Sequence, residues 1–299
     1  ILTYIIIKMD KNKKALVIGG SGFLGSHLAE TLNDKGYKVT ILDKQKIKLN
    51  RKIKFIKGNI KDNKKLEKVI KGINYVYFLA GMGDIQECMD NPIQTISQNI
   101  VTVLNVMNCC KKNKIKRFIF ASTIYVHSSQ GSFYRVSKQS AELYIEEFSK
   151  KHNLKYTILR YGTVYGPRSD MRNNIFSIIS NAIKLKKVIY RGTKKSIRRF
   201  VHVKDASFAS VDILKKKFQN KKVVITGNSK TKLSGFLESL RKKMNINKEV
   251  IYQNKSAGHY EVNPYIATSG KEIRYDFKKN ISFKEGIKEL TKNIEKNIK

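Results

Sequence analysis

Residues 15–25 read ALVIGGSGFLG, an apolar run that leads directly into three spaced glycines. The run has the length of a buried strand, and the apolar residues of 23–35 recur at helical spacing, so the glycines join a strand to a helix. Such a loop turns tightly, lets a phosphate approach the backbone and points the free N–H groups of the helix toward it. Because it follows the first strand, we interpret it as a dinucleotide site rather than a plain turn. The residues expected to hold the cofactor here are Gly19, Ser21, Gly22, Phe23, Leu24 and Gly25.

The first half of the chain alternates short apolar runs with segments of helical periodicity. This alternation produces right-handed βαβ units and a parallel sheet that helices cover on both faces. The predicted fold class is therefore α/β, a Rossmann-type doubly wound parallel sheet. The expected strands are 15–19, 38–42, 53–56, 75–80, 117–121 and 155–160, and the expected helices are 23–35, 62–71, 92–112 and 134–152.

The pattern becomes less regular after Pro167. We expect helices near 174–186, 205–216 and 282–297 and strands near 188–190, 200–203 and 222–226. The chain then divides into a dinucleotide-binding domain, 13–167 with a returning strand near 222–227, and a smaller C-terminal α/β cap, 168–299, that binds substrate.

Charge is the most unusual feature of the composition. The 299 residues include 61 Lys and Arg against 23 Asp and Glu, a formal net charge of +38. The basic residues are spread along the whole chain rather than gathered in one segment, and Lys, Asn and Ile are frequent together while Trp is absent. This pattern indicates a compositional bias, so we do not expect a nucleic-acid partner. The excess charge would still attract an anionic substrate.

The cysteines and the apolar segments indicate a compartment. Cys88, Cys109 and Cys110 have no metal-ligand spacing, so we expect no metal site, and an odd number of scattered thiols is typical of the reducing cytoplasm. The apolar start, 1–7, is too short to span a bilayer and lacks the layout of a signal peptide. We expect Met9 to be the natural start and 1–8 to be an extension. No segment has the ~18 apolar residues of a membrane helix, and none is expected.

Asp43 ends the second expected strand, about 20 residues after the glycine loop. A carboxylate there can accept hydrogen bonds from the adenosine ribose and would repel a 2′-phosphate, which favours NAD over NADP. Lys44 weakens the preference, and a turn-capping role for Asp43 is the alternative.

Tyr134 and Lys138 form a Y-x-x-x-K pair at the start of an expected helix. Residues four apart share one helix face, so the phenol and the ammonium group point the same way. A phenol with an ordinary pKa near ~10 is a poor base at neutral pH, and a nearby Lys⁺ and a positive nicotinamide would lower that pKa. Lys138 would also hold the nicotinamide ribose. A chance surface pair is the alternative.

The G-x-x-G-x-x-G spacing, followed by Y-x-x-x-K, resembles the extended short-chain dehydrogenase/reductases, specifically the NAD-dependent epimerase/dehydratase family that includes UDP-glucose 4-epimerase. The resemblance covers nearly the whole chain. Residues 58–62 (GNIKD) are similar to the family's G-D-I/V-x-D, which implies that Asn59 and Ile60 lie against the adenine. Residues 78–81 (FLAG) are similar to H-L-A-A, which implies cofactor contacts for Leu79, Ala80 and Gly81. Asn99 matches a family asparagine on the next helix.

The same resemblance implies the rest of the site. Residues 121–123 (AST) are similar to the family motif whose last hydroxyl bonds the reacting oxygen, so Thr123 joins Tyr134 and Lys138 as a catalytic residue, with Ser122 as the alternative. Residues 160–167 (RYGTVYGP) resemble L-R-x-x-N-V-Y-G-P. The match implies a cofactor contact for Tyr161 and a substrate contact for Thr163, which replaces the usual Asn. Arg198 matches the Arg of R-D-F, which meets the substrate diphosphate, while Arg199 replaces the acid.

Three departures from the family bear on the substrate. The segment between Thr123 and Tyr134 is short, which implies a more open pocket in which His127 and Gln130 contact the sugar. The Asp-Glu pair that dehydratases carry after the hydroxyl residue is Ile-Tyr here, at 124–125, which argues against elimination of water. A family Arg for the second phosphate is missing, and Lys255 would take its place.

The resemblance therefore implies an NAD-dependent nucleotide-sugar epimerase that acts at C4 of a UDP-hexose through a keto-sugar. An NAD(P)-dependent reductase of a nucleotide-linked keto-sugar is the alternative. A third interpretation is a cofactor-sensing or RNA-binding protein without catalysis, since fold does not fix function. The family also implies a homodimer formed by the helices 92–112 and 134–152.

Overall fold

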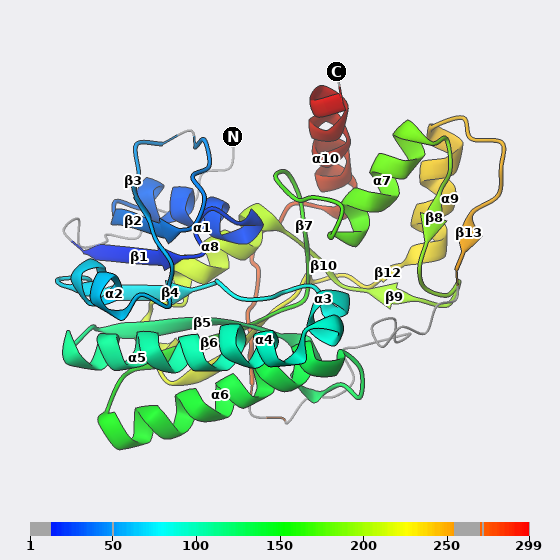
Figure 1. The fold of residues 1–299 in the computed structure, drawn as a ribbon. Helices are drawn as coiled ribbons and strands as arrows, with labels where there is room; N and C mark the ends of the chain where they lie inside the picture. The colour runs from blue at the N-terminus through cyan, green and yellow to red at the C-terminus, as the bar shows by residue number, and fades with distance from the viewer. Residues whose placement is uncertain (1–12, 50, 254–269, 271, 299) are drawn as a thin grey trace.

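The structure is a computed structural model that describes residues 13–49, 51–253, 270 and 272–298. Within these residues, one parallel sheet of eight strands forms the body of the molecule, in the order β14-β11-β6-β5-β4-β1-β2-β3 (Figure 1). Its strands are β1 (Lys14–Ile18), β2 (Lys38–Asp43), β3 (Lys54–Lys57), β4 (Tyr75–Phe78), β5 (Arg117–Thr123), β6 (Tyr156–Tyr161), β11 (Lys221–Ile225) and β14 (Ile273–Arg274). The predicted α/β fold class is confirmed.

Strand β1 lies between β2 and β4, so the strand order reverses direction beside it. Residues 15–18 of β1 are all apolar and buried. Such a run is typical of a central parallel strand that helices cover on both faces. Ala15 and Val17 face one layer of the core, and Leu16 and Ile18 face the other. In open α/β sheets, ligands bind at the carboxyl ends of the strands next to such a reversal. The fold therefore places a binding site at the end of β1.

Helices cover both faces of the sheet (Figure 1). One layer holds α1 (Phe23–Asp34) and α8 (Val203–Asp212), whose alanines allow close packing; the other holds α2 (Asn63–Ile70), α5 (Thr102–Lys112) and α6 (Ser132–His152). The helix predicted over 92–112 is interrupted, because α4 (Pro92–Ile96) and α5 are joined by a turn of π-helix at Ser97–Val101.

The segments after residue 167 serve two purposes. Strands β11 and β14 and helix α8 complete the sheet and its cover, whereas α7 (Asn174–Lys184), α9 (Leu233–Lys243) and α10 (Phe283–Ile298) pack around a separate apolar core. This second unit also contains short strands, which are β7 (Thr163–Tyr165), β8 (Ile189–Tyr190), β9 (Ile197–Arg198), β10 (Phe200–His202), β12 (Thr231–Lys232) and β13 (Ile251–Tyr252). The domain boundary at residue 167 stays a prediction, and the sheet draws on both sides of it.

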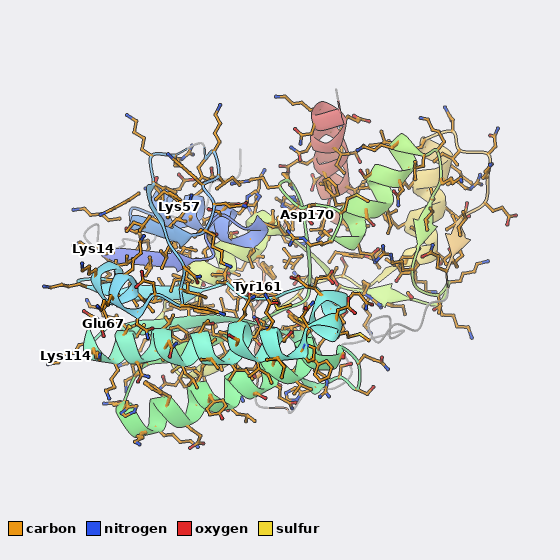
Figure 2. The ribbon with its side chains drawn as sticks, viewed as in Figure 1. Lys14, Lys57, Glu67, Lys114, Tyr161 and Asp170 are labelled. Carbon is orange, nitrogen blue, oxygen red and sulfur yellow. The ribbon has the colours of Figure 1, made fainter. Side chains whose placement is uncertain are left out.

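The surface carries the excess charge. Lys14, Lys57 and Lys114 are exposed and lie at the periphery of the sheet, while Tyr161 lies in the interior (Figure 2). The helices in the described part of the chain include none that is both long and apolar enough to cross a membrane.

Helix α1 crosses the end of β1 in close contact. A Cβ built on Gly25 would lie 2.2 Å from the carbonyl oxygen of Gly19, far inside van der Waals contact. Gly25 therefore lets the helix sit directly on the strand end, and no larger residue fits without moving the helix.

We expect Gly25→Ala to lower the midpoint of thermal unfolding by several degrees, because the added methyl group must push the helix away from the loop. The matched control is Gly235→Ala in α9, where a Cβ would meet open space. This control should raise stability slightly, since alanine favours helix. Calorimetry of both variants checks the pair, and equal effects would contradict the packing argument.

Candidate active site

The glycine loop lies between the end of β1 and the start of α1, as the sequence predicts. Gly19 has a left-handed backbone (φ +81°), and a Cβ on it would lie 2.6 Å from the backbone nitrogen of Ala80. Gly22 is the N-cap of α1, and among the described residues no side chain caps this helix end and no acid lies in its first turn. The first N–H groups of α1 are therefore open to an anion, as a phosphate site requires.

Asp43 lies beside this loop. Its Oδ2 accepts a hydrogen bond from the backbone N–H of Ser21 (2.9 Å), and its Oδ1 accepts one from Lys44 N–H (2.7 Å). The backbone oxygen of Asp43 accepts a bond from Gly58 N–H (2.9 Å), which brings the neighbouring Asn59 close to it. The carboxyl ends of β2 and β3 thus carry the predicted ribose and adenine residues next to the predicted phosphate loop.

Asn99 is buried and hydrogen bonded within the chain. Its Oδ1 accepts from Met82 N–H (2.8 Å), and its Nδ2 donates to Met82 O (3.0 Å) and to Ser137 Oγ (3.0 Å). Gly81 (φ +133°) lies against it, because a Cβ there would be 2.5 Å from Asn99 Oδ1. The π-helical turn places Asn99 so that it fixes the 79–82 segment against α6; a cofactor contact for it stays a prediction.

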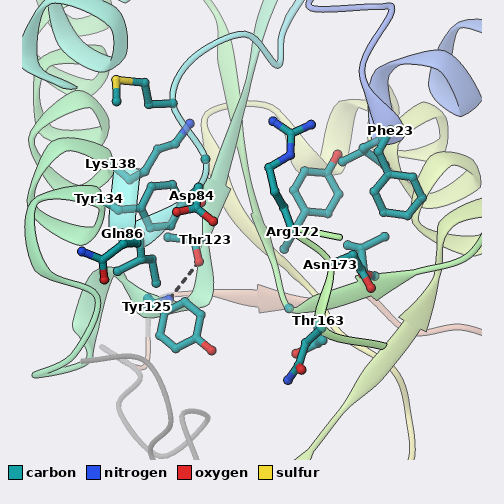
Figure 3. Close-up of a pocket in the computed structure, with 18 of the residues that line it drawn as sticks. Phe23, Asp84, Gln86, Thr123, Tyr125, Tyr134, Lys138, Thr163, Arg172 and Asn173 are labelled. Carbon is teal, nitrogen blue, oxygen red and sulfur yellow. Dashed lines mark hydrogen bonds between the residues drawn. The ribbon is translucent and has the colours of Figure 1, made fainter. Parts of the chain in front are cut away.

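A cavity of about 880 Å³ opens at the carboxyl ends of the strands (Figure 3). In Figure 3, Tyr134, Lys138 and Thr123 lie on one side of it, and Phe23, Arg172 and Thr163 lie on the other. The lining contains the predicted residues Phe23, Leu24, Leu79, Gly81, Thr123, Tyr134, Lys138, Tyr161, Thr163 and Arg198.

Several lining residues were missed by sequence reasoning, among them Asp84, Gln86, Tyr125, Arg172, Arg191 and Gln253. Most come from loops and short helices with no regular spacing; Asp84, for example, is the N-cap of α3 (Ile85–Asp90) and accepts from Glu87 N–H (2.9 Å). The Asp-x-x-Glu capping pattern at 84–87 was the available signal for that helix.

Thr123, Tyr134 and Lys138 converge from two elements. Tyr134 and Lys138 lie in the first two turns of α6, which follows the left-handed Gly131 (φ +102°). Thr123 ends β5, and its Oγ1 accepts a bond from Tyr125 N–H (3.2 Å), so its own hydrogen remains for the Tyr134 phenol, with which it is hydrogen bonded. The ammonium group of Lys138 donates to Ala121 O (3.0 Å).

Burial dominates the electrostatics of this trio. It raises the pKa of Tyr134 to about 12, an effect that the hydrogen bond from Thr123 opposes. Burial also lowers the pKa of Lys138 to about 8, against the attraction of Cys88 and Glu142. The expectation that Lys138 lowers the pKa of Tyr134 does not hold for the chain alone. A further positive charge in the cavity is needed to make the phenol a base near neutral pH.

The opposite wall is cationic and built by the second unit. Arg198 is buried and donates from Nη1 to Ile197 O (2.8 Å), while Arg199 donates from Nη1 to Asn228 O (2.6 Å). Tyr161 turns its ring to the cavity and pairs its hydroxyl with Ser210 Oγ (2.6 Å). An arginine in this position suits a phosphate or diphosphate group.

Two predicted sugar contacts lie elsewhere. Neither His127 nor Gln130 is among the described residues that line the cavity. His127 Nε2 instead lies 2.9 Å from Arg160 Nη1 and 3.1 Å from Glu272 Oε1. The short loop folds inward as a 3-10 turn (Ile124–His127), and that turn brings Tyr125 to the cavity instead. Lys255 lies outside the described residues. In the described part of the chain, no group of His, Cys, Asp and Glu side chains could hold a metal ion.

Comparison with known sequences gives a family and a relative. Residues 15–226 match the model of the NAD dependent epimerase/dehydratase family. The chain is 27% identical over 304 residues to a putative UDP-glucose 4-epimerase of Methanocaldococcus jannaschii, an alignment that covers 94% of this chain and 98% of that protein.

Solved structures share the architecture. The UDP-glucose 4-epimerase of Thermotoga maritima with UDP-glucose has a TM-score of 0.80 at 25% identity, covering 96% of this chain and 100% of that one. The UDP-glucuronic acid 4-epimerase of Bacillus cereus with UDP-glucuronic acid and NAD has a TM-score of 0.81 at 23% identity, covering 95% and 99%. At 23% identity, the comparison with the Bacillus cereus enzyme shows a shared fold and nothing further.

The lowered pKa of Lys138 predicts how stability depends on pH. Between pH 8 and 10 the unfolded chain holds a proton on this lysine that the folded chain has released, so Lys138 contributes a rise of roughly 2 kcal/mol to the free energy of unfolding over the interval. Burial raises the pKa of the thiols of Cys88, Cys109 and Cys110, which contribute a fall over the same interval, so the lysine's share is the difference between the wild type and Lys138→Met. Lys138→Met should lack this rise and be more stable than the wild type below pH 8. Denaturant unfolding at several pH values checks this.

The control is Lys150→Met, which removes a lysine of the same helix that is 71% exposed and pairs with Glu147. Its profile should run parallel to that of the wild type. If the Lys138→Met profile also ran parallel, the ammonium group would not be the desolvated one.

Proposed function

The chain belongs to the NAD dependent epimerase/dehydratase family, and from this premise we propose that it is an NAD-dependent epimerase that inverts C4 of a UDP-hexose. The observation that carries the proposal is the trio of Thr123, Tyr134 and Lys138, which faces an arginine wall across one cavity. Within the trio, Thr123 and Lys138 are buried and Tyr134 is partly exposed. The named relatives act on UDP-sugars. Residues 124–125 are Ile-Tyr, so no carboxylate follows Thr123 that could eliminate water.

The residues at the strand ends fit NAD. The uncapped start of α1 would take the pyrophosphate, with Gly19, Ser21, Gly22 and Gly25 allowing its approach. Asp43 would accept the ribose hydroxyls, and its charge would repel a 2′-phosphate, which favours NAD over NADP. Asn59 and Ile60 would border the adenine, and Lys138 would hold the nicotinamide ribose. When bound, NAD accepts a hydride from the sugar carbon and returns it to the opposite face.

The chain supplies proton transfer and placement. Tyr134 removes the proton of the C4 hydroxyl and later returns it, as a general base and acid. The raised pKa of Tyr134 keeps the phenol protonated in the chain alone. The positive nicotinamide of bound NAD would lower that pKa, so Tyr134 would act as a base only when the cofactor is bound. Thr123 donates its hydrogen bond to the phenol or the sugar oxygen, and the bond it accepts from Tyr125 N–H keeps that hydrogen directed there.

The opposite wall would hold the substrate. Arg198 would meet the diphosphate, and Thr163 and Tyr125 would border the sugar. Epimerisation requires the keto-sugar to present both faces, and the cavity of about 880 Å³ would give the sugar room to turn beside the nicotinamide. The diphosphate on Arg198 then serves as a fixed anchor.

We expect Tyr134→Phe to lower kcat for the interconversion of UDP-glucose and UDP-galactose by ~10²–10⁴-fold, because the general base is lost. The cofactor should still be released on denaturation in stoichiometric amount. Chromatography of the sugar nucleotides, without added cofactor, checks the rate. Tyr144→Phe, on the exposed face of the same helix, is the control and should leave the rate unchanged. An empty protein that consumed NADPH with a keto-sugar would indicate the reductase instead.

We also propose that the enzyme is a homodimer that works in the cytoplasm. Large apolar side chains are exposed along α4–α6, and they include Ile93 (78% exposed), Leu143 (58%), Tyr144, Ile96, Val101 and Val136. A second copy of the same helices would cover this face, as in other twofold interfaces. The three cysteines are free and buried, which suits a reducing compartment.

Leu143→Glu should convert the dimer to a monomer, because a carboxylate would be buried without a partner at the centre of this face. Light scattering coupled to gel filtration measures the mass. Met171→Glu, equally exposed but outside this face, should leave the mass unchanged. A wild-type protein that is already monomeric would refute the interface.

A further inference from the structure

Helix α6 carries a third buried polar residue in line with the catalytic pair. Tyr134, Lys138 and Glu142 occur at every fourth position and therefore share one face of the helix. Lys138 and Glu142 are 6% and 2% exposed, and the Tyr134 phenol is enclosed as well. A buried carboxylate is costly unless it is hydrogen bonded and paired, so Glu142 needs a reason to be there.

Glu142 bonds the strand that carries Thr123. Its Oε1 accepts a short hydrogen bond from Ser122 Oγ (2.5 Å), and Ser122 is the residue directly before Thr123 in β5. One turn earlier, Lys138 Nζ donates to Ala121 O, the residue before Ser122. The end of β5 is thus tied to α6 at two successive residues, and these bonds set the distance between Thr123 and Tyr134.

Arg160 of β6 holds the carboxylate in place. Its Nε donates to Glu142 Oε1 (3.0 Å), and its Nη2 donates to Oε2 (2.5 Å), a two-point contact that fixes the plane of the carboxylate. Ser122 and Arg160 are neighbours in the sheet. The remaining Nη1 contacts Glu272 and His127.

Charged side chains surround Glu142, and Lys138 lies one helical turn before it on α6. Two carboxylates, Glu142 and Glu272, share one guanidinium group, and all three side chains are almost fully buried. The groups that act on Lys138 are Cys88 from α3 and Glu142 from its own helix. Those that face Glu142 are Arg160, Lys138, Ser122 and the Tyr156 phenol.

We propose that Glu142 is a positioning residue of the active site: locked by Arg160, its carboxylate holds Ser122 and hence Thr123 in place, and from one turn along the same buried helix face its charge favours the protonated form of Lys138. The effect of Glu142 on Lys138 during catalysis rests on the proposed function. The placement of Ser122 and Thr123 rests only on the hydrogen bonds of the folded chain.

The experiment compares Glu142→Gln with the wild type in two readouts. Gln keeps an acceptor for Ser122 but removes the charge, so Lys138 should lose its proton at a pH lower by roughly one unit. The rise that Lys138 contributes to the free energy of unfolding, measured as the difference from the matching Lys138→Met variant, should begin at a correspondingly lower pH. The alkaline limb of kcat/KM for UDP-glucose should move in the same direction by a similar amount.

Two comparisons isolate the interaction. On a Lys138→Met background, Glu142→Gln should leave the shape of the stability profile unchanged, because the group that responds is gone. Glu146→Gln, one turn further along α6, removes a carboxylate that pairs with Lys222 (2.9 Å) and with the Tyr156 phenol, and it should leave the Lys138 contribution to both readouts unshifted. An unshifted profile in folded Glu142→Gln would overturn the counter-charge role. A wild type that epimerises no UDP-hexose would refute the proposed function alone, since the stability profile would still report on Glu142.

Ser122→Ala tests the positioning role of Glu142. The same variant provides the test if Glu142→Gln does not fold. It removes the bond to Glu142 without changing any charge. We expect kcat to fall by about tenfold with KM and cofactor content unchanged, because Thr123 is misplaced relative to Tyr134. An unchanged kcat would show that the Ser122–Glu142 bond does not position the site.

Discussion

The parallel direction of the strands is the constraint on which the site depends. When strands run the same way, their carboxyl ends lie along one edge of the sheet, and side chains that are far apart in sequence meet there. The glycine loop after β1, Asp43 after β2 and Thr123 after β5 are brought together in this way. Hydrogen bonds between strand ends then refine the arrangement, as in the contact of Gly58 N–H with Asp43 O. The close crossing of α1 over β1, which Gly25 permits, sets where the helix end points.

Local signals allowed much of the fold and part of the site to be predicted. The strand before the glycine loop, the helix after it and the pairing of Tyr134 with Lys138 depend on residues close in sequence, so their patterns are visible there. Strand β14 has two residues and no pattern of its own; its place is set by β11, some fifty positions earlier. The interruption at Ser97–Val101 is likewise set by what Asn99 bonds, namely Met82 and Ser137.

The errors within the site have the same origin. His127 was placed at the sugar because its loop is short, but it contacts Glu272, 145 positions away, and no local pattern reports that contact. The sequence predicts a lowered pKa for Tyr134 from Lys138 and a positive nicotinamide together, whereas in the chain alone burial raises that pKa. Arg172 and Asp84 line the cavity from loops whose course depends on tertiary packing. Sequence patterns identify residue types, helices and strands. They do not show how deeply a charged side chain is buried, because burial depends on how the helices pack on the sheet.

The bond between Arg160 and Glu272 joins positions 112 residues apart. This separation matters while the chain is being made on the ribosome. Ribosomes add about 5–20 residues per second, so on the order of ten seconds pass between the emergence of the arginine and that of its second carboxylate. During the first part of that interval β1 to β6 can already pair, yet β6 is an edge strand until β11 has been made. The nascent sheet therefore first exposes its growing edge at the strand that carries Arg160. Strand β11 then covers that edge before Glu272 has been added.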